Sequence, residues 1–386
     1  MSKYIFSLYH LITLFIIPTL VVITGFKYNT ETSANLSLIY SIVFMVFFPL
    51  NGNVRHYILN SNNNYINNLI TFRLLSYFPL FLLSFLIAYF VLDTDYKTIL
   101  KIVLLGSFYW INEIFVSFEE KNNKYQLIFL LIILYSFSLF MTLFVDNIKG
   151  DFTYVLIAYL ISLIFALDSI FKKLKFKIVI KNVISDIKEM IIPQIGGTFM
   201  IGISSFLYKV LILSFISKSV AGTIFIALTI SGLMLTVFTY GLGPSIIKNQ
   251  ISKDQKTTVN LIYKLSVIPI LIGIMSVLLK YFNIINFEII ENQEIFFYCF
   301  GISLMGIPFS ILGQYFKLSV IYQSLKLNVY IYDSIPNLSV LLLILLIILN
   351  FETYLVGITY LYTGALTFFI YKRLYSQSNR VVRQNI

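Results

Sequence analysis

Charged residues are scarce along the whole chain, and this scarcity sets the first limit on what the protein can be. Asp, Glu, Lys and Arg together make up 12% of the 386 residues, whereas hydrophobic residues make up 59%, and the mean hydropathy is +0.88. A chain of this composition predicts that lipid is the solvent for most of its surface. That prediction excludes most classes of soluble enzyme.

Residues and motifs needed for several common chemistries are also missing. Cys299 is the only cysteine, so an internal disulfide is excluded. There is no G-x-x-x-x-G-K-S/T loop for ATP hydrolysis, and the two histidines, His10 and His56, are too far apart in the sequence to suggest a metal pair. No catalytic Ser or Cys constellation is visible. The sequence therefore predicts a protein that is not an enzyme and has no cofactor or metal ion.

What the sequence does contain is a series of apolar runs that recur from end to end. A run of about 20 residues crosses the ~30 Å hydrocarbon core of a bilayer as a helix, and continuous hydrophobicity favours helices over a β-barrel. We expect an all-α polytopic membrane protein with about 12 transmembrane helices. The expected spans are residues 5–25, 34–57, 69–92, 99–118, 126–145, 152–171, 190–215, 223–247, 259–280, 296–316, 329–348 and 354–371.

The basic residues predict the orientation of these spans. If both termini are cytoplasmic, 21 of the 28 Lys and Arg residues lie at cytoplasmic ends, as the positive-inside rule favours. The net charge of +11 then reflects this bias and attraction to anionic membrane lipids, so nucleic acid is not an expected partner.

The longest polar connection divides the chain into two sets of about six spans. In segment 172–189, lysines interleave with apolar residues, which is typical of an amphipathic linker helix on the cytoplasmic face. It predicts an N-terminal lobe at 1–171 and a C-terminal lobe at 190–386 with a basic tail. The second span of each half carries Gly and Pro near its cytoplasmic end, at Pro49 and Pro244. Such paired interruptions are typical of transporters built from repeats, although helix-packing glycines are an alternative.

Ionisable residues inside the spans are the candidates for function. Each costs roughly 2.5–3.5 kcal/mol at mid-membrane on insertion scales, so it is expected to face a cavity or a partner. Five of six lie in the cytoplasmic third and one lies deeper; the six are Arg55, Arg73, Glu113, Asp168, Asp333 and the deeper Lys209. This pattern predicts a polar vestibule open to the cytoplasm.

Helical spacing places several of these residues on polar stripes that should point into the protein. Gln194 shares a stripe with Lys209, and Trp110 shares one with Glu113. Alternatives remain open: the arginines could snorkel to the interface, Asp168 and Asp333 could pair structurally with a lysine, and Trp110 could be an interface anchor. Since Arg offers a planar fork and Lys a point charge to phosphate, the cations favour an anionic lipid head group as ligand.

The chain resembles a known family in three stretches. These are Phe206-Leu207-Tyr208-Lys209, Ala221-Gly222-Thr223-Ile224-Phe225, and residues 48–57 with the sequence FPLNGNVRHY. Together with the twelve spans in a 6+6 arrangement, they are similar to Wzx-type polysaccharide flippases of the multidrug/oligosaccharidyl-lipid/polysaccharide exporter superfamily.

This resemblance implies a fold, a substrate and a site. It implies two six-helix lobes around a cationic central cavity in a bacterial inner membrane, and alternating access driven by H⁺ or Na⁺. The implied substrate is an undecaprenyl-pyrophosphate-linked oligosaccharide, an O-antigen, capsule or exopolysaccharide unit, moved from the cytoplasmic to the periplasmic leaflet. The implied substrate-binding cations are Arg55, Lys209 and Arg73, and the residues implied for ion coupling or a polar lumen are Glu113, Asp168, Asp333, Gln194 and Trp110.

Two other functions remain open at this point. A multidrug or cation exporter would share the fold but favour a neutral or acidic cavity, so the placement of Arg55 and Lys209 argues against it. A membrane glycan polymerase or ligase would need a large outer loop, whereas the longest one here, around residues 281–294, is short.

Overall fold

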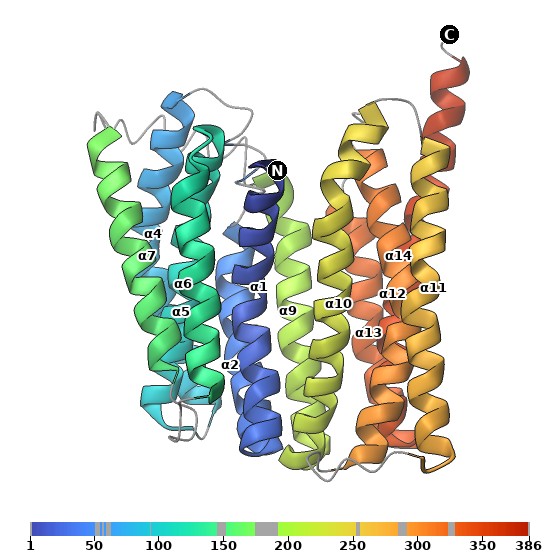
Figure 1. The fold of residues 1–386 in the computed structure, drawn as a ribbon. Coiled ribbons are helices and arrows are strands. Elements are labelled where there is room, and N and C mark those ends of the chain that lie inside the picture. Colours follow the sequence, from blue (N-terminus) through green and yellow to red (C-terminus); the bar gives the residue numbers. More distant parts are fainter. Residues whose placement is uncertain are drawn as a thin grey trace. The chain divides into compact units, whose positions relative to one another are not determined.

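Long apolar segments can satisfy their backbone hydrogen bonds in lipid only as helices or closed barrels, and this chain forms helices. The computed structural model describes residues 2–50, 55, 58, 63–92, 94–144, 152–173, 192–251, 255–284, 292–322 and 329–384. Within these ranges the regular structure is helical throughout, and eleven helices are long and apolar enough to cross a membrane (Figure 1). A shorter apolar stretch, Thr153–Ala166, accompanies them. The expected all-α multi-pass membrane protein is confirmed.

Twelve α-helices and two short 3₁₀ helices make up the described chain. The α-helices are α1 (Ser2–Lys27), α2 (Thr30–Phe47), α4 (Asn63–Val91), α5 (Tyr96–Lys121), α6 (Tyr125–Phe144), α7 (Thr153–Lys173), α9 (Ile192–Phe215), α10 (Lys218–Ile251), α11 (Gln255–Tyr281), α12 (Gln293–Tyr322), α13 (Val329–Asn350) and α14 (Ile358–Gln384). The 3₁₀ helices are η1 (Phe48–Leu50) and η2 (Thr353–Gly357).

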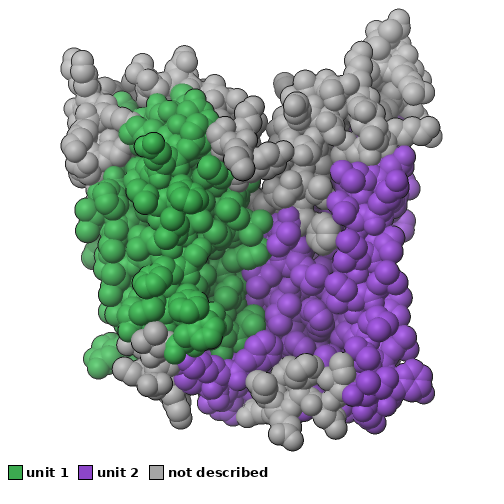
Figure 2. All heavy atoms as spheres, viewed as in Figure 1, with its two compact units in different colours: residues 1–23, 35–206 green, residues 24–34, 207–386 purple. Residues whose placement is uncertain are grey.

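The chain forms two compact units, which Figure 2 shows in different colours. Unit 1 comprises residues 1–23 and 35–206, and unit 2 comprises residues 24–34 and 207–386. Residues 24–34, which form the end of α1 and the start of α2, thus belong to unit 2. Within this unit Thr30 Oγ1 lies 3.1 Å from Ser219 Oγ at the start of α10. The predicted linker 172–189 lies outside the described residues beyond Lys173, so its division of the chain stays a prediction.

Of the two expected Gly/Pro interruptions, the structure contains one. Helix α2 ends at Phe47 and gives way to η1, which holds Pro49. Helix α10, in contrast, continues through Gly241 and Pro244 to Ile251. A proline removes only one backbone donor, and neighbouring groups in a membrane bundle can satisfy the carbonyl that it frees.

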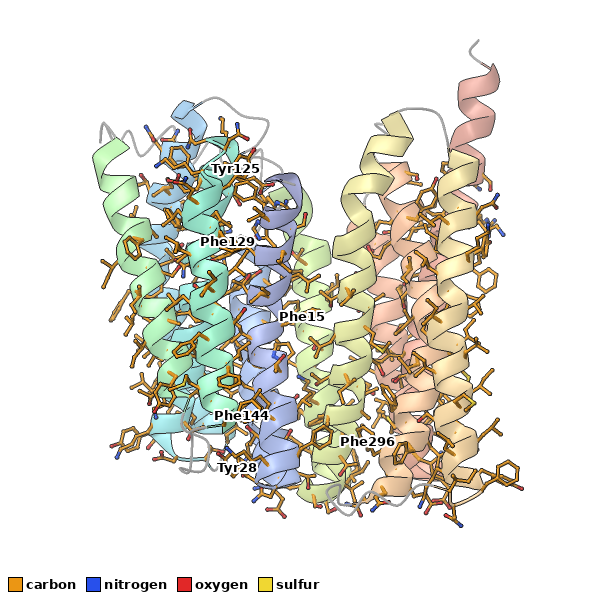
Figure 3. The ribbon with its side chains drawn as sticks, viewed as in Figure 1. Phe15, Tyr28, Tyr125, Phe129, Phe144 and Phe296 are labelled. Carbon is orange, nitrogen blue, oxygen red and sulfur yellow. The ribbon has the colours of Figure 1, made fainter. Side chains whose placement is uncertain are left out.

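One central helix organises each unit. In unit 1, α5 contacts α4, α6 and α7, and its span is the most buried of the eleven. In unit 2, α12 contacts α10, α11 and α14. The surrounding helices present large apolar side chains outward: Phe129 and Phe144 on α6 are 52% and 70% exposed (Figure 3). Such a surface suits lipid rather than water.

Small residues allow α11 and α12 to approach closely within unit 2. A Cβ atom built on Gly273 would lie 2.6 Å from the carbonyl oxygen of Gly301, and one on Gly301 would lie 2.7 Å from the carbonyl oxygen of Gly273. Both distances are shorter than van der Waals contact. Because lipid tails are as apolar as the side chains, close backbone packing of this kind stabilises helix pairs in membranes.

We predict that Gly301→Val separates α11 from α12 and destabilises unit 2 by about 1–3 kcal/mol, the usual cost of overpacking. The measurement is the thermal unfolding midpoint of purified protein in detergent. Gly232→Ala is the matched control, since its new Cβ would meet only the tip of the Tyr360 side chain, at 3.2 Å. An unfolding midpoint for Gly301→Val equal to that of the control would contradict the close packing.

Candidate functional site

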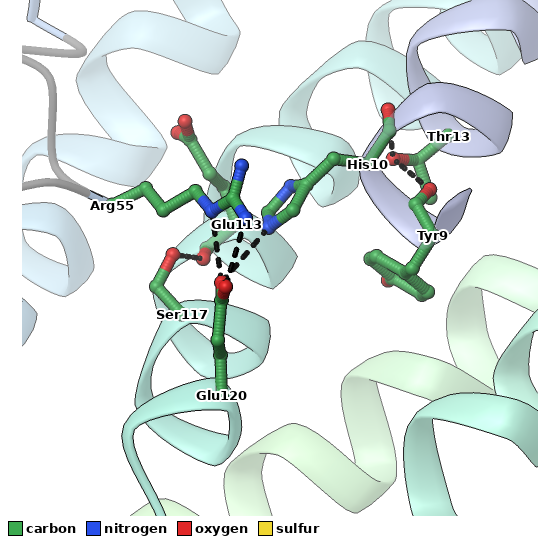
Figure 4. Close-up of polar contacts among 7 residues, drawn as sticks. All are labelled: Tyr9, His10, Thr13, Arg55, Glu113, Ser117 and Glu120. Atoms are coloured by element: carbon green, nitrogen blue, oxygen red, sulfur yellow. Dashed lines mark hydrogen bonds and ion pairs between the residues drawn. The ribbon is translucent and has the colours of Figure 1, made fainter. Parts of the chain in front are cut away.

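Five ionisable side chains gather within unit 1, and we call them the unit 1 charge cluster: His10, Arg55, Arg73, Glu113 and Glu120. His10 lies on α1, Arg73 on α4, and both glutamates on α5. Glu113 and Glu120 are seven residues apart, which places them two turns apart on one face of the helix. The central helix of the unit therefore supplies the carboxylates, and its neighbours supply the groups that face them (Figure 4).

Arg55 and Glu120 form a bidentate ion pair. Arg55 Nε donates to Glu120 Oε2 and Arg55 Nη2 donates to Glu120 Oε1, each at 2.8 Å. Parallel bonds of this kind are among the strongest that proteins make. His10 approaches the same carboxylate, with its Nε2 3.6 Å from Glu120 Oε2.

Arg73 is almost fully enclosed, with 1% of the residue exposed. Its Nη2 donates to Glu113 Oε2 at 3.1 Å, its Nη1 donates to the carbonyl oxygen of Trp110, and its guanidinium carbon lies 4.5 Å from the centre of the Trp110 ring. The carboxylate and the ring face both favour the charged guanidinium. Trp110 itself is 2% exposed, so its role here is to enclose Arg73 rather than to anchor the protein at a membrane interface.

The formal charges of the ion pairs described in this region of unit 1 balance. Besides the two arginine–glutamate pairs, Glu119 lies fully buried 3.2 Å from Lys124 Nζ. Three carboxylates thus face three cations, and the group is neutral as long as His10 carries no proton. Arg55 and Arg73 therefore do not present uncompensated positive charge.

Unit 2 holds a second polar group, built on Asp333 of α13. Lys317 Nζ on α12 lies 2.6 Å from Asp333 Oδ2, and the hydroxyl of Tyr371 on α14 donates to Asp333 Oδ1 at 2.7 Å. Both carboxylate oxygens are thus engaged. Pairing of Asp333 with a lysine was one of the alternatives open from the sequence, and it is the arrangement that the structure contains.

Three candidates from the sequence remain: Lys209, Asp168 and Gln194. Lys209 on α9 is partly buried in unit 2, with its Nζ 5.8 Å from the centre of the Phe225 ring. The side chains of Asp168 and Gln194 lie outside the described residues. The roles assigned to these three residues stay predictions.

Sequence reasoning missed Glu120, His10, Lys317 and Tyr371. Glu120 fell just beyond the expected span 99–118, and His10 was considered only as a metal ligand. The seven-residue spacing from Glu113 to Glu120 could have identified the carboxylate face of α5.

With this geometry in view, comparison with known proteins identifies the fold. No family model and no curated relative matches the sequence. Among solved structures, the chain is similar to a multidrug resistance MATE family transporter of the MOP superfamily in its inward-facing conformation (TM-score 0.65, 11% identity, 98% of this chain and 95% of that one). It is also similar to the outward-facing conformation of such a transporter (0.60, 11%, 98% and 96%) and to a mutant of the Vibrio cholerae MATE transporter VcmN (0.55, 12%, 99% and 98%). The chain has the fold of these MATE structures.

These comparisons correct the predicted function. The Wzx-type flippase assignment, with a lipid-linked oligosaccharide as substrate, is wrong, because the fold is shared with solved structures of multidrug resistance MATE transporters. The physical reason for the error lies in unit 1. Arg55 and Arg73 suggested an anion site, but each is paired with a glutamate.

We predict that Glu113→Gln destabilises the protein by about 3–5 kcal/mol, because it leaves the buried charge of Arg73 without a carboxylate. The double variant Arg73→Met/Glu113→Leu removes both charges and should recover most of that loss. Thermal unfolding in detergent measures both. Glu294→Gln, at an exposed position in the first turn of α12, is the matched control. A single variant as stable as this control would contradict the pairing.

Proposed function

We propose that the protein is a MATE-like secondary transporter that exports hydrophobic organic cations in exchange for H⁺ or Na⁺. One observation carries the proposal: the chain aligns over 98% of its length with a multidrug resistance MATE transporter in both its inward-facing and its outward-facing conformations. A fold that occurs in both states is suited to alternating access.

The charge arrangement supports a cationic rather than an anionic substrate. The sequence-based objection to a cation exporter was the placement of Arg55 and Lys209. Since Arg55 is paired with Glu120, and Arg73 likewise with Glu113, the arginines no longer support that objection. Carboxylates within transmembrane helices are also typical carriers of coupling ions, and Glu113, Glu120 and Asp333 are the described candidates.

The membrane setting is part of the proposal. The excess of Lys and Arg at one end of the spans favours a cytoplasmic membrane with both chain termini in the cytoplasm. Membrane lipids would then surround the exposed apolar faces of helices such as α6.

The test is gradient-driven transport by the purified protein in liposomes. A panel of fluorescent organic cations, with ethidium among them, is presented under an imposed proton gradient and, separately, an imposed sodium gradient. We expect at least one dye to accumulate against its concentration, and the accumulation to vanish when an ionophore collapses the gradient. Protein-free liposomes and the Lys264→Gln variant, which alters an exposed charge, are the controls.

A different result would contradict the proposal. If no dye responded to either gradient while a fluorescent lipid-linked oligosaccharide crossed the same membranes, the cation-exporter assignment would be wrong. Dye movement at the same rate with and without the proton or sodium gradient would contradict the exchange mechanism.

A further inference from the structure

The unit 1 charge cluster contains one group whose charge can change near neutral pH. The carboxylates and guanidinium groups around it are already paired, as Arg55 with Glu120 and Arg73 with Glu113. Imidazole is the side chain that ordinarily gains and loses a proton between pH 5 and 8. Gain of a proton at His10 would turn a neutral cluster into one with a charge of +1.

The geometry places His10 where that proton would have an effect. The imidazole is 4% exposed, and its Nε2 makes no hydrogen bond within the described structure. It lies 3.6 Å from Glu120 Oε2, within the range of an ion pair but beyond the length of a hydrogen bond. The same oxygen accepts the 2.8 Å bond from Arg55 Nε. A protonated His10 would therefore compete with Arg55 for one carboxylate oxygen.

The groups around His10 come from five parts of unit 1. Glu120 faces it from α5, and Arg55 approaches from the segment after α2 (Figure 4). Glu113 lies two turns earlier on α5 and is bonded to Arg73 of α4. On α1 the ring of Tyr9 meets the imidazole edge to face, with centroids 5.8 Å apart, and Tyr135 of α6 packs against Tyr9. The negative charges nearest to His10 already have cationic partners, so its proton would be the only unbalanced charge of the group.

We propose that His10, Glu120 and Arg55 form a proton-binding site. Protonation of His10 moves the Glu120 carboxylate away from Arg55 and toward the imidazole of His10 on α1. In this step a proton from water forms a bond to His10 Nε2, and no other covalent bond changes. The carboxylate then ties α5 to α1 more tightly and holds Arg55 less tightly. The site suits a proton rather than a metal cation, because hard cations need several oxygen ligands and both oxygens of Glu120 are already engaged by Arg55.

The role of this site in transport rests on the proposed function. If the protein exchanges a substrate for a cation, the site identifies that cation as H⁺ and places its binding in unit 1. Proton binding by itself does not depend on the identity of the substrate, and it can be measured without any substrate.

The first experiment measures proton binding directly. The chain has two histidines, so His56→Gln leaves His10 as the only imidazole. Nitrogen-15 NMR of histidine-labelled protein in lipid nanodiscs, from pH 5 to 8, should show this imidazole gaining a proton. Glu120→Gln in the same background should lower the protonated fraction at each pH, whereas Lys264→Gln should leave it unchanged. Two results would overturn the proposal: an imidazole that stays in one protonation state from pH 5 to 8, or a protonated fraction that Glu120→Gln does not change.

The second experiment measures coupling. In liposomes, His10→Gln should abolish dye accumulation driven by a proton gradient, yet retain the flux of dye down its own concentration gradient. Lys264→Gln should retain both activities. Proton-driven accumulation by His10→Gln equal to that of the unmodified protein would overturn the coupling role. If the unmodified protein moves no dye at all, the proposed function fails, and the NMR titration still decides whether the proton site exists.

Discussion

A charge among apolar helices needs a compensating partner, because lipid cannot hydrate it. Among the described residues, each unit contains at least one ion pair that meets this requirement at its central helix. Helix α5 provides Glu113 and Glu120 to arginines that approach from elsewhere in unit 1, and α12 provides Lys317 to Asp333 in unit 2. These ion pairs join neighbouring helices. Hydrophobic contact alone gives two helices little preference for each other, because lipid tails are as apolar as the side chains.

The same requirement decides how the arginines are to be interpreted. An arginine in a transmembrane segment can mark an anion site or one half of an ion pair, and its own sequence position does not distinguish the two. Arg73 is 1% exposed and bonded to Glu113, so a phosphate would have to displace the Glu113 carboxylate to bind it. Breaking a buried pair of this kind is costly. Neutral, carboxylate-containing clusters are consistent with cation exchange, the function that we propose for this fold.

Much of the fold could be predicted from the sequence, because the length and hydrophobicity of each segment are local properties. The helices at 5–25 and 126–145 follow directly from runs of apolar residues. The partners of Arg73 and Asp333 could not be predicted, since Glu113 meets Arg73 only after α4 packs on α5, and Lys317 of α12 meets Asp333 of α13 only in the folded unit 2. Helix α5 extends three residues beyond the expected end at 118, to Lys121, and this small boundary error removed Glu120 from the candidates. The function was mispredicted because the sequence does not show that Arg73 pairs with Glu113 and Arg55 with Glu120.

The pairing of these charges is tested most directly by an experimental density map of the protein in lipid nanodiscs, at a resolution that separates side chains. We predict continuous density between Arg55 and Glu120, with the His10 ring beside the same carboxylate, and an Arg73 guanidinium stacked on Trp110 and bonded to Glu113. Arginine side chains that point away from both glutamates into a water-filled space would contradict it.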